Sequence, residues 1–244
     1  MKTKKPSLMT DLCIDIGNTA AKAALYRDGR LQKVLYDTRP ADWDLCAVDR
    51  MAFMRTGEHP AWEEVLTHWR RKPLVHISAS LRLPFRNLYE TPDTLGADRV
   101  ALTAGAAKLY RGHRLVIDAG TCVTYDLLNR HDEYEGGIIS PGLVSRYRAM
   151  HEHTAGLPLL APNEQIPQVP GRNTAACMHA GATGGWLMEI EGYIRHFEER
   201  YPGLKVIVTG GDAPFLYKSI KNKIFAFQKF LAFEGMQYLL TLNT

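Results

Sequence analysis

The sequence lacks the features that mark secreted, disulfide-stabilised and membrane proteins. Its 244 residues include only four cysteines, none in a CxxC pair, and we expect these cysteines to be buried free thiols. The apolar run after the N-terminal lysines is interrupted by Asp11 and Asp15, before it is long enough for a signal peptide or a membrane span. We therefore expect a soluble, cytoplasmic protein that does not bind a membrane.

A strong charge pattern is also missing. The formal net charge is only +4, and no stripe of basic residues alternates with aromatic residues, as is typical of nucleic-acid-binding surfaces. We therefore expect no nucleic-acid partner. A small anionic substrate remains compatible with this charge, because one or two well-placed cations are enough to bind it.

Several catalytic signatures are absent as well. The sequence contains no GxxxxGK[ST] phosphate loop, no HExxH zinc motif and no GxSxG nucleophile elbow, which argues against a P-loop enzyme and weakens the case for a hydrolase. His151 and His153 flank Glu152 in a predicted helix, where positions i and i+2 point apart, so they are expected on the surface rather than around a metal.

What the sequence does contain is a repeated arrangement of an apolar strand followed by a glycine turn. The strand at residues 11–16 leads into Asp15-Ile16-Gly17-Asn18-Thr19, and the strand at 114–118 leads into Asp118-Ala119-Gly120-Thr121. A third strand at 204–209 is followed by Gly210 and Gly211. Such turns indicate a nucleotide held between two related halves.

The wider pattern of apolar residues predicts an α/β protein with two similar lobes, at about residues 1–112 and 113–244. Each lobe begins with three strands joined by turns, at 11–16, 21–27 and 31–36, and at 114–118, 122–128 and 133–139. Further strands are expected at 74–79, 204–209 and 224–227. Helices are expected at 61–69, 96–110, 143–153, 214–220, from 231 onward and, with a kink near Gly181 to Gly185, from Asn173 to Tyr201.

Each candidate site residue also has a purely structural interpretation. Gly17 and Asn18 alone form an ordinary hairpin turn, but Asp15 could hold Mg²⁺, directly or through water, against transferred phosphates. Asp118 repeats the position of Asp15, yet it would also suit an Asx turn or a hydrogen bond to Thr121 or Thr124. These alternatives stay open at the level of the residues.

The same holds for the candidates on helices. Asp98 in a first helical turn is favoured by the helix dipole alone, and Arg99 beside it could be solvated. Thr174 could simply cap a helix. Gly210 and Gly211 could form a plain strand-to-helix turn, although their amides would also suit a phosphate or an adenosine.

Taken in order, the motifs resemble those of the type III pantothenate kinases, a family of the acetate kinase, sugar kinase, Hsp70 and actin superfamily. The matching segments cover most of the chain: Asp15-Ile-Gly-Asn-Thr19, Tyr89-x-x-Pro92, Gly96-Ala-Asp-Arg99, Asp118-Ala-Gly-Thr121, Gly136-Gly137-x-Ile139-x-Pro141-Gly142, Asn173-Thr174 and Thr209-Gly210-Gly211. Cys122 is a departure, since alanine is expected there. The resemblance implies two duplicated actin-like (ribonuclease H-like) lobes, each a mixed sheet flanked by helices, with a central nucleotide cleft.

The resemblance also implies a reaction, namely ATP-dependent phosphorylation of pantothenate to 4′-phosphopantothenate, the first step of coenzyme A biosynthesis. Asp98 would be the general base, Asp15 would orient Mg²⁺, and Asp118 would bind a monovalent cation such as K⁺ or NH₄⁺. The ATP-binding residues would be Asp15, Ile16, Gly17, Asn18, Thr19, Ala20, Ala21, Lys22, Thr121, Gly210 and Gly211. The substrate-binding residues would be Tyr89, Gly96, Ala97, Asp98, Arg99 and Thr174.

The resemblance further implies a homodimer in which Thr174 reaches the substrate of the other protomer. Two alternatives belong to the same fold: a non-catalytic nucleotide-binding regulatory protein, and a kinase for another small hydroxy substrate. The set formed by Tyr89, Asp98 and Arg99 argues against the regulatory protein, which has no need of a site that accepts a hydroxyl group.

Overall fold

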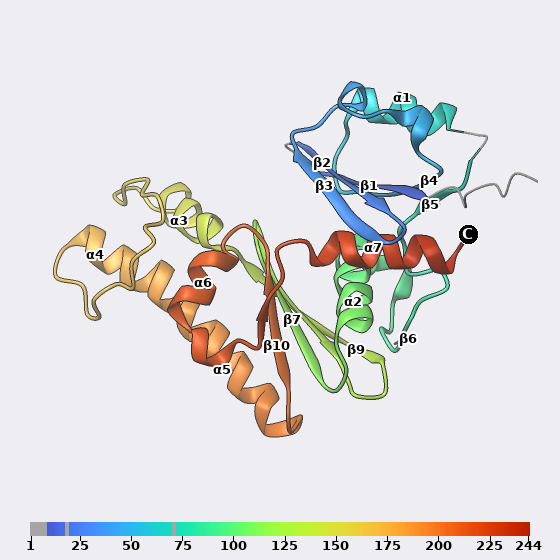
Figure 1. Ribbon diagram of the computed structural model, residues 1–244. Helices are drawn as coiled ribbons and strands as arrows, with labels where there is room; N and C mark the ends of the chain where they lie inside the picture. The colour runs from blue at the N-terminus through green and yellow to red at the C-terminus, as the bar shows by residue number, and fades with distance from the viewer. Residues whose placement is uncertain (1–8, 18–19, 70–71) are drawn as a thin grey trace, which may run out of the picture. The chain divides into compact units, whose positions relative to one another are not determined.

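The computed structural model describes residues 9–17, 20–69 and 72–244, and Figure 1 shows the course of the chain. The chain forms two compact units. The first consists of the chain up to Leu109 together with Leu231–Thr244, and the second is Tyr110–Phe230. Among the described residues, no helix is long and apolar enough to cross a membrane.

The first unit is built on a five-stranded mixed sheet in the order β3-β2-β1-β4-β5. Its strands are β1 (Thr10–Ile16), β2 (Ala21–Arg27), β3 (Arg30–Tyr36), β4 (Arg50–Arg55) and β5 (Leu74–His76). The first three strands are antiparallel, whereas β4 and β5 continue the sheet in parallel. The unit also contains α1 (Pro60–His68), α2 (Ala97–Leu109), α7 (Leu231–Leu242), the two-residue strand β6 (Arg86–Asn87) and 3₁₀ turns at Pro40–Asp42, Leu45–Ala47 and Pro92–Thr94.

Strand β1 has two chemically different faces. Leu12, Ile14 and Ile16 lie in one hydrophobic cluster with the fully buried Trp62 of α1. The alternate residues of the same strand are Asp11, Cys13 and Asp15, which point to the opposite face because successive side chains of a strand alternate. The second face is therefore the one that carries the charged and titratable groups.

The second unit repeats this plan. Its strands are arranged in the order β11-β10-β7-β8-β9, and they are β7 (Arg114–Ala119), β8 (Cys122–Leu128), β9 (Glu133–Pro141), β10 (Lys205–Thr209) and β11 (Ala226–Phe227). Strands β7 to β9 form an antiparallel meander, and β10 and β11 add in parallel. The helices are α3 (Leu143–Glu152), α4 (Thr174–His179), α5 (Gly185–Arg200) and α6 (Ala213–Ser219), with a 3₁₀ turn at Lys221–Lys223.

The repeated strand order confirms the predicted α/β fold with two mixed sheets flanked by helices. The strands predicted at 21–27 and 122–128 are found at those residues, and helix α2 follows its prediction within one residue at each end. The structure adds β4, which the sequence analysis missed. Its sequence, Arg-Met-Ala-Phe-Met-Arg, has no β-branched residue, so it lacks the usual strand signal.

The long helix predicted from Asn173 to Tyr201 is interrupted where its glycines lie. Helix α4 and helix α5 are joined by a π-helical segment at Ala180–Gly184, which contains Gly181. Glycine has no side chain to hold a regular helical turn, so this is where the backbone deviates most easily. The predicted kink thus corresponds to a change of helix type.

Two predictions need correction. The final helix, α7, was assigned to the second lobe, but it belongs to the first unit, where its Leu231 and Gly235 pack directly on α2. The cysteines were expected to be buried; all four are free thiols, but only Cys13 is buried, whereas Cys46, Cys122 and Cys177 are exposed. Cys46 lies in a 3₁₀ turn, Cys122 is the first residue of β8 and Cys177 lies in the short helix α4.

Candidate active site

The first group of candidate residues lies at the β1–β2 hairpin of the first unit. Asp15 and Lys22 face each other across the two strands, and the turn is closed by a hydrogen bond from the Gly17 amide to the Ala20 carbonyl at 3.2 Å. A side chain at Gly17 would lie only 3.1 Å from that carbonyl oxygen. The predicted phosphate contacts Asn18 and Thr19 lie outside the described residues.

The hairpin carries a carboxylate in a poorly hydrated position. Burial raises the pKa of Asp15, and the nearby Asp98 carboxylate raises it further, while the Lys22 ammonium opposes both effects. The charge of Asp98 thus acts on Asp15, so the two acidic residues of this unit are electrostatically coupled. Carboxylate oxygens in a partly buried position are suited to a hard cation such as Mg²⁺.

Asp98 lies in the first turn of α2. A Cβ atom at Gly96 would come within 2.4 Å of its Oδ1 atom, so the carboxylate occupies space that only glycine leaves free. Oδ1 also accepts a hydrogen bond from the Arg99 amide at 2.9 Å. The N-terminal turn of the helix thus fixes the acidic side chain by backbone contacts, with Ala97 as the first helical residue.

Arg99 and Tyr89 lie together beside this turn. The Arg99 guanidinium is 5.6 Å from the centre of the Tyr89 ring, within the range of a cation–π contact. Arg99 is only 5% exposed, which contradicts the alternative of a solvated arginine. The structure thus brings together the substrate residues predicted in the first unit, from Tyr89 to Arg99.

The second unit has its own group of candidates, around Asp118 at the end of β7. The neighbouring strand β10 places Thr209 opposite Asp118, so Gly210 follows directly beside it. A Cβ atom at Gly210 would lie 2.4 Å from Asp118 Oδ1 and 2.3 Å from the Ala119 carbonyl oxygen. Two oxygen atoms therefore converge on the space that Gly210 leaves open.

The turn after Asp118 is held in place by a further glycine. The Gly142 amide donates a hydrogen bond to the Thr121 carbonyl at 3.0 Å, and a Cβ at Gly142 would come within 2.0 Å of the Gly120 carbonyl oxygen. Thr121 remains exposed at the surface of this turn. Its hydroxyl group is thus carried by a tightly packed backbone and is accessible to a ligand.

Asp212 is a neighbour that the sequence analysis did not single out. Its amide donates to the Ala119 carbonyl at 2.9 Å, and burial raises the pKa of its carboxyl group. Its position directly after Gly210 and Gly211, just ahead of α6, is the sequence signal that could have identified it.

Thr174 is exposed at the start of α4. The N-cap of this helix is Asn173, whose Oδ1 accepts a hydrogen bond from the Ala176 amide at 2.8 Å. The interpretation of Thr174 as a capping residue is therefore wrong, and its hydroxyl has no capping role. Thr174 and Asp118 lie on different elements of the second unit, α4 and β7.

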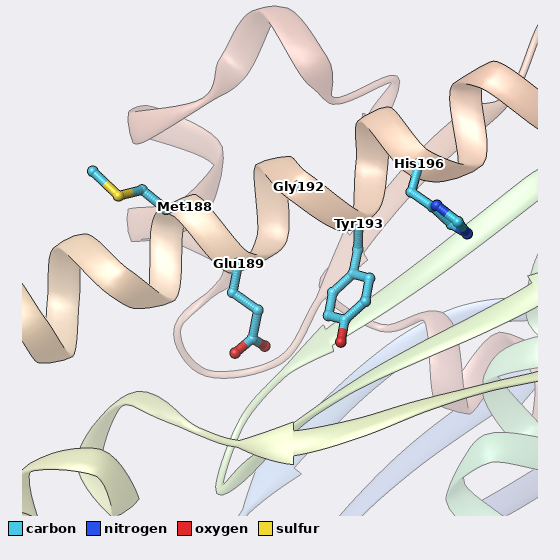
Figure 2. A pocket seen from close by; sticks show the side chains of 5 residues that line it. All are labelled: Met188, Glu189, Gly192, Tyr193 and His196. Carbon is cyan, nitrogen blue, oxygen red and sulfur yellow. The ribbon is translucent and has the colours of Figure 1, made fainter.

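Two cavities in the described part of the second unit are lined by residues other than the predicted site residues. One, of about 330 Å³, lies along α5 and is lined by Met188, Glu189, Gly192, Tyr193 and His196. Figure 2 shows Glu189 and Tyr193 pointing from α5 toward the strands, while Met188 points away. The Glu189 carboxylate accepts hydrogen bonds from the side chains of Tyr125, Ser140 and Arg146 at 3.0, 3.1 and 2.5 Å. These bonds link α5 to the sheet and to α3, so the role of Glu189 here is structural.

Most of the candidate residues lie in a stretch of sequence that matches a known protein family. Residues 11–196 match the family model described as type III pantothenate kinase. Type III pantothenate kinases from Flavobacterium johnsoniae and Bacteroides fragilis are each 38% identical to the chain. The alignments cover 90% of this chain and 93% of the first relative, and 96% of this chain and 98% of the second.

Solved structures show the same fold at lower identity. A candidate Baf family transcriptional activator from Campylobacter jejuni aligns with a TM-score of 0.61 and 22% identity, over 94% of this chain and 97% of that one. An inorganic polyphosphate/ATP-glucomannokinase from Arthrobacter aligns with a TM-score of 0.51 and 13% identity, over 97% of this chain and all of that one. These likenesses show that the chain shares its α/β fold of two mixed sheets flanked by helices with these proteins. By its sequence match over most of its length, the chain belongs to the type III pantothenate kinase family.

Proposed function

We propose that the protein transfers the γ-phosphoryl group of ATP to pantothenate, giving 4′-phosphopantothenate as the first step of coenzyme A biosynthesis in the cytoplasm. The observation that carries the proposal is the Asp98 carboxylate in the first turn of α2, with Arg99 packed on Tyr89 beside it. An acidic group and a cation side by side suit a substrate that has a reactive hydroxyl and a carboxylate. The relatives named type III pantothenate kinases support the choice of substrate.

Asp98 is the proposed proton acceptor. The oxygen of the primary hydroxyl of pantothenate forms the new bond to the γ-phosphorus, the bond from that phosphorus to the ADP oxygen breaks, and the hydroxyl proton passes to the Asp98 carboxylate. Positioning contributes more than base strength in such reactions, because phosphoryl transfer chiefly requires alignment and charge stabilisation. Arg99 would bind the carboxylate of pantothenate, with Tyr89, Gly96 and Ala97 completing the contact.

Asp15 would hold Mg²⁺, directly or through water. Its half-buried carboxylate close to Asp98 offers the hard oxygen donors that this ion prefers. Mg²⁺ bound together with ATP would neutralise part of the negative charge of the ATP phosphates. In this proposal the hairpin from Asp15 to Lys22 contacts the ATP phosphates.

The second unit would supply further ATP contacts and a monovalent cation site. Thr121 and the amides of Gly210 and Gly211 are the proposed ATP contacts. The Asp118 carboxylate and the Ala119 carbonyl, which converge beside Gly210, are oxygen donors that fit K⁺ or NH₄⁺. Potassium would then offset phosphate charge in the reaction.

We further propose a homodimer in which Thr174 of one copy contributes to the substrate site of the other. Exposed apolar side chains on the second unit support an interface, since Ile139, Val144 and Met188 are 63%, 45% and 61% exposed. Thr174 is exposed and makes no cap. Its hydroxyl is thus available to a second chain.

The decisive experiment compares Asp98→Asn with Asp93→Asn, an exposed aspartate in the 3₁₀ turn just before α2. Incubation with ATP, Mg²⁺, K⁺ and pantothenate is followed by detection of 4′-phosphopantothenate. Asp98→Asn should reduce kcat by at least about 100-fold, because general-base catalysis contributes on the order of 10²–10⁴-fold, and should leave ATP affinity unchanged. Asp93→Asn should behave like the unmodified protein.

Other outcomes identify the alternatives. ATP binding without any phosphorylated pantothenate would contradict the proposal and favour a nucleotide-binding regulatory protein. Product from another small hydroxy compound, with none from pantothenate, would favour a kinase of different specificity. Equal losses of turnover and ATP affinity in Asp98→Asn would make Asp98 a structural residue.

A further inference from the structure

Helix α7 crosses α2 in the first unit with the two backbones in contact (Figure 1). A Cβ atom at Gly235 would lie 1.7 Å from the Ala101 carbonyl oxygen, and one at Gly105 would lie 2.4 Å from the Leu231 carbonyl oxygen. Glycine on both helices therefore allows an approach that any side chain would prevent. These contacts hold α2 closely against α7.

A chain of polar contacts beside this crossing links α2 and α7 to strands β1 and β2. Lys108, in the last turn of α2, donates to Glu234 at 2.8 Å and to Gln237 at 3.0 Å, both on α7. Glu234 accepts from the Tyr26 hydroxyl of β2 at 3.2 Å, and Gln237 donates to Asp11 of β1 at 3.3 Å.

Strand β1 is itself anchored at this point. Asp11 is 1% exposed and accepts two hydrogen bonds from the Arg50 guanidinium of β4, at 2.8 and 2.7 Å. Such two-point contacts fix geometry better than a single ion pair. We call Asp11, Tyr26, Arg50, Lys108, Glu234 and Gln237 the anchor network.

The anchor network lies at one end of two elements whose other ends carry the acidic residues of the site. Asp11 and Asp15 are both on β1, about 13 Å apart at the usual rise of a strand. Lys108 and Asp98 are both on α2, about 15 Å apart at the rise of a helix. The anchor network lies at the Asp11 and Lys108 ends of these spans, and Asp15 and Asp98 lie at the other ends, so a shift of α2 along its axis would change the separation of the two carboxylates.

Cys13, in the middle of β1, indicates which face of the strand lies against the helices. Cys13, between the two aspartates, is fully buried, and burial together with the Asp11 carboxylate raises the pKa of its thiol. The charges of Lys108 and Glu234 also act on that thiol. The face of β1 that bears Asp11, Cys13 and Asp15 is the face against which α7 packs, since Gln237 of α7 reaches Asp11 there.

We propose that Lys108, Glu234 and Gln237 are positioning residues for phosphoryl transfer, fixing α2 along its axis so that Asp98 is held at its working distance from Asp15. The inference rests on the proposed role of Asp98 as proton acceptor. None of the three residues would touch ATP or pantothenate, and all lie at the far end of α2 from the reacting groups. They act through the backbone of the helix.

The first test is a kinetic comparison of Lys108→Met with Lys108→Arg. A misplacement of 1 Å costs on the order of 100-fold in rate, so a partial slip of α2 in Lys108→Met should lower kcat by about tenfold. The KM values for ATP and pantothenate should stay within about twofold, since the binding groups remain. Lys108→Arg keeps the charge and donors and should restore most of kcat. A lower melting temperature with unchanged kcat would overturn the proposal.

The second test does not depend on activity. Hydrogen exchange of the backbone amides is followed in residues 97–101, at the start of α2, and in residues 11–16 of β1. Lys108→Met should speed exchange in residues 97–101, at the end of α2 remote from the substitution. Faster exchange confined to the residues around Lys108 and Glu234 would overturn the proposal.

Matched variants keep the test decisive. Glu198→Gln breaks the exposed ion pair with Lys223 in the second unit and should change neither kcat nor exchange in residues 97–101. Lys108→Met leaves the Glu234 carboxylate without its cation, which could prevent folding. In that case the double variant Lys108→Met with Glu234→Gln, which removes this carboxylate as well, is used in place of the single variant. A protein that makes no phosphorylated pantothenate would refute the proposed function, while the exchange measurement still decides the role of the anchor network.

Discussion

The neighbouring glycines Gly210 and Gly211 offer a sharp test of the packing around Asp118. Gly210 has a φ of +97°, and a Cβ there would lie 2.3 Å from the Ala119 carbonyl oxygen and 2.4 Å from Asp118 Oδ1. At Gly211 a Cβ meets no atom within 4 Å, and φ is not in the left-handed region. The same substitution at adjacent positions should therefore have opposite consequences.

The magnitudes follow from two separate costs at Gly210. A left-handed backbone costs an alanine about 1–2 kcal/mol, and forcing an extra carbon into a packed site costs about 1–3 kcal/mol. Gly210→Ala should thus lower the free energy of unfolding by about 2–5 kcal/mol. Gly211→Ala should change it by no more than about 1 kcal/mol, with a gain expected because alanine restricts the unfolded chain.

Urea denaturation followed by circular dichroism measures both variants. The denaturation midpoint of Gly210→Ala should fall while the slope with urea stays the same, since the surface exposed on unfolding is unchanged. Equal midpoints for the two variants would refute the reasoning, because they would mean that Asp118 and the Ala119 carbonyl move aside without cost. In the folded fraction of Gly210→Ala, the response of activity to K⁺ should also weaken, since the new methyl group displaces Asp118 Oδ1.

Three further outcomes are expected. Asp15→Asn should abolish phosphoryl transfer yet raise the melting temperature of the ligand-free protein near pH 7. The folded-state pKa of Asp15 is raised, so its ionised form destabilises the fold at a pH above that pKa. The gain should shrink as the pH falls through the folded-state pKa and disappear below about 4, the usual pKa of an aspartate, where the carboxyl becomes protonated in both states. An equal gain at all pH values would contradict this. Asp118→Asn should remove or alter the dependence of kcat on K⁺, and an unaltered potassium titration would place the cation elsewhere. Asn173→Ala should cost about 1 kcal/mol of unfolding free energy through the lost N-cap of α4, measured by urea denaturation; no change would show that the Ala176 amide is satisfied by water.

Local chemistry explains why much of the architecture could be predicted. Strands β1 and β2 and the turn at Gly17 are specified by alternating apolar residues and by a glycine turn, which act over a few neighbouring residues. The same is true of α2, whose first turn follows Gly96 and contains Asp98. The repeat of this pattern at Asp118 made the duplication of the two units visible from the sequence.

Other features depend on residues far apart in the chain. Strand β4 has no strand signal of its own and forms because it pairs with β1. The sequence pattern of α7 is that of an amphipathic helix and does not say which unit it joins; its contacts with α2 and with Asp11 of β1 place it in the first unit. Burial of Arg99 also requires the Tyr89 loop to fold over it, which no local pattern encodes.

The sequence by itself thus determined the two strand–turn motifs, the acidic residue at the start of α2 and, through their order, the family. Only the tertiary structure decided how these residues are held. The anchor network joins Asp11 to Gln237 across 226 positions of the chain, and Gly210 makes room for Asp118 on a neighbouring strand. Such contacts arise when separate elements pack, because the distance between two side chains is set by the elements that carry them and not by their separation in sequence.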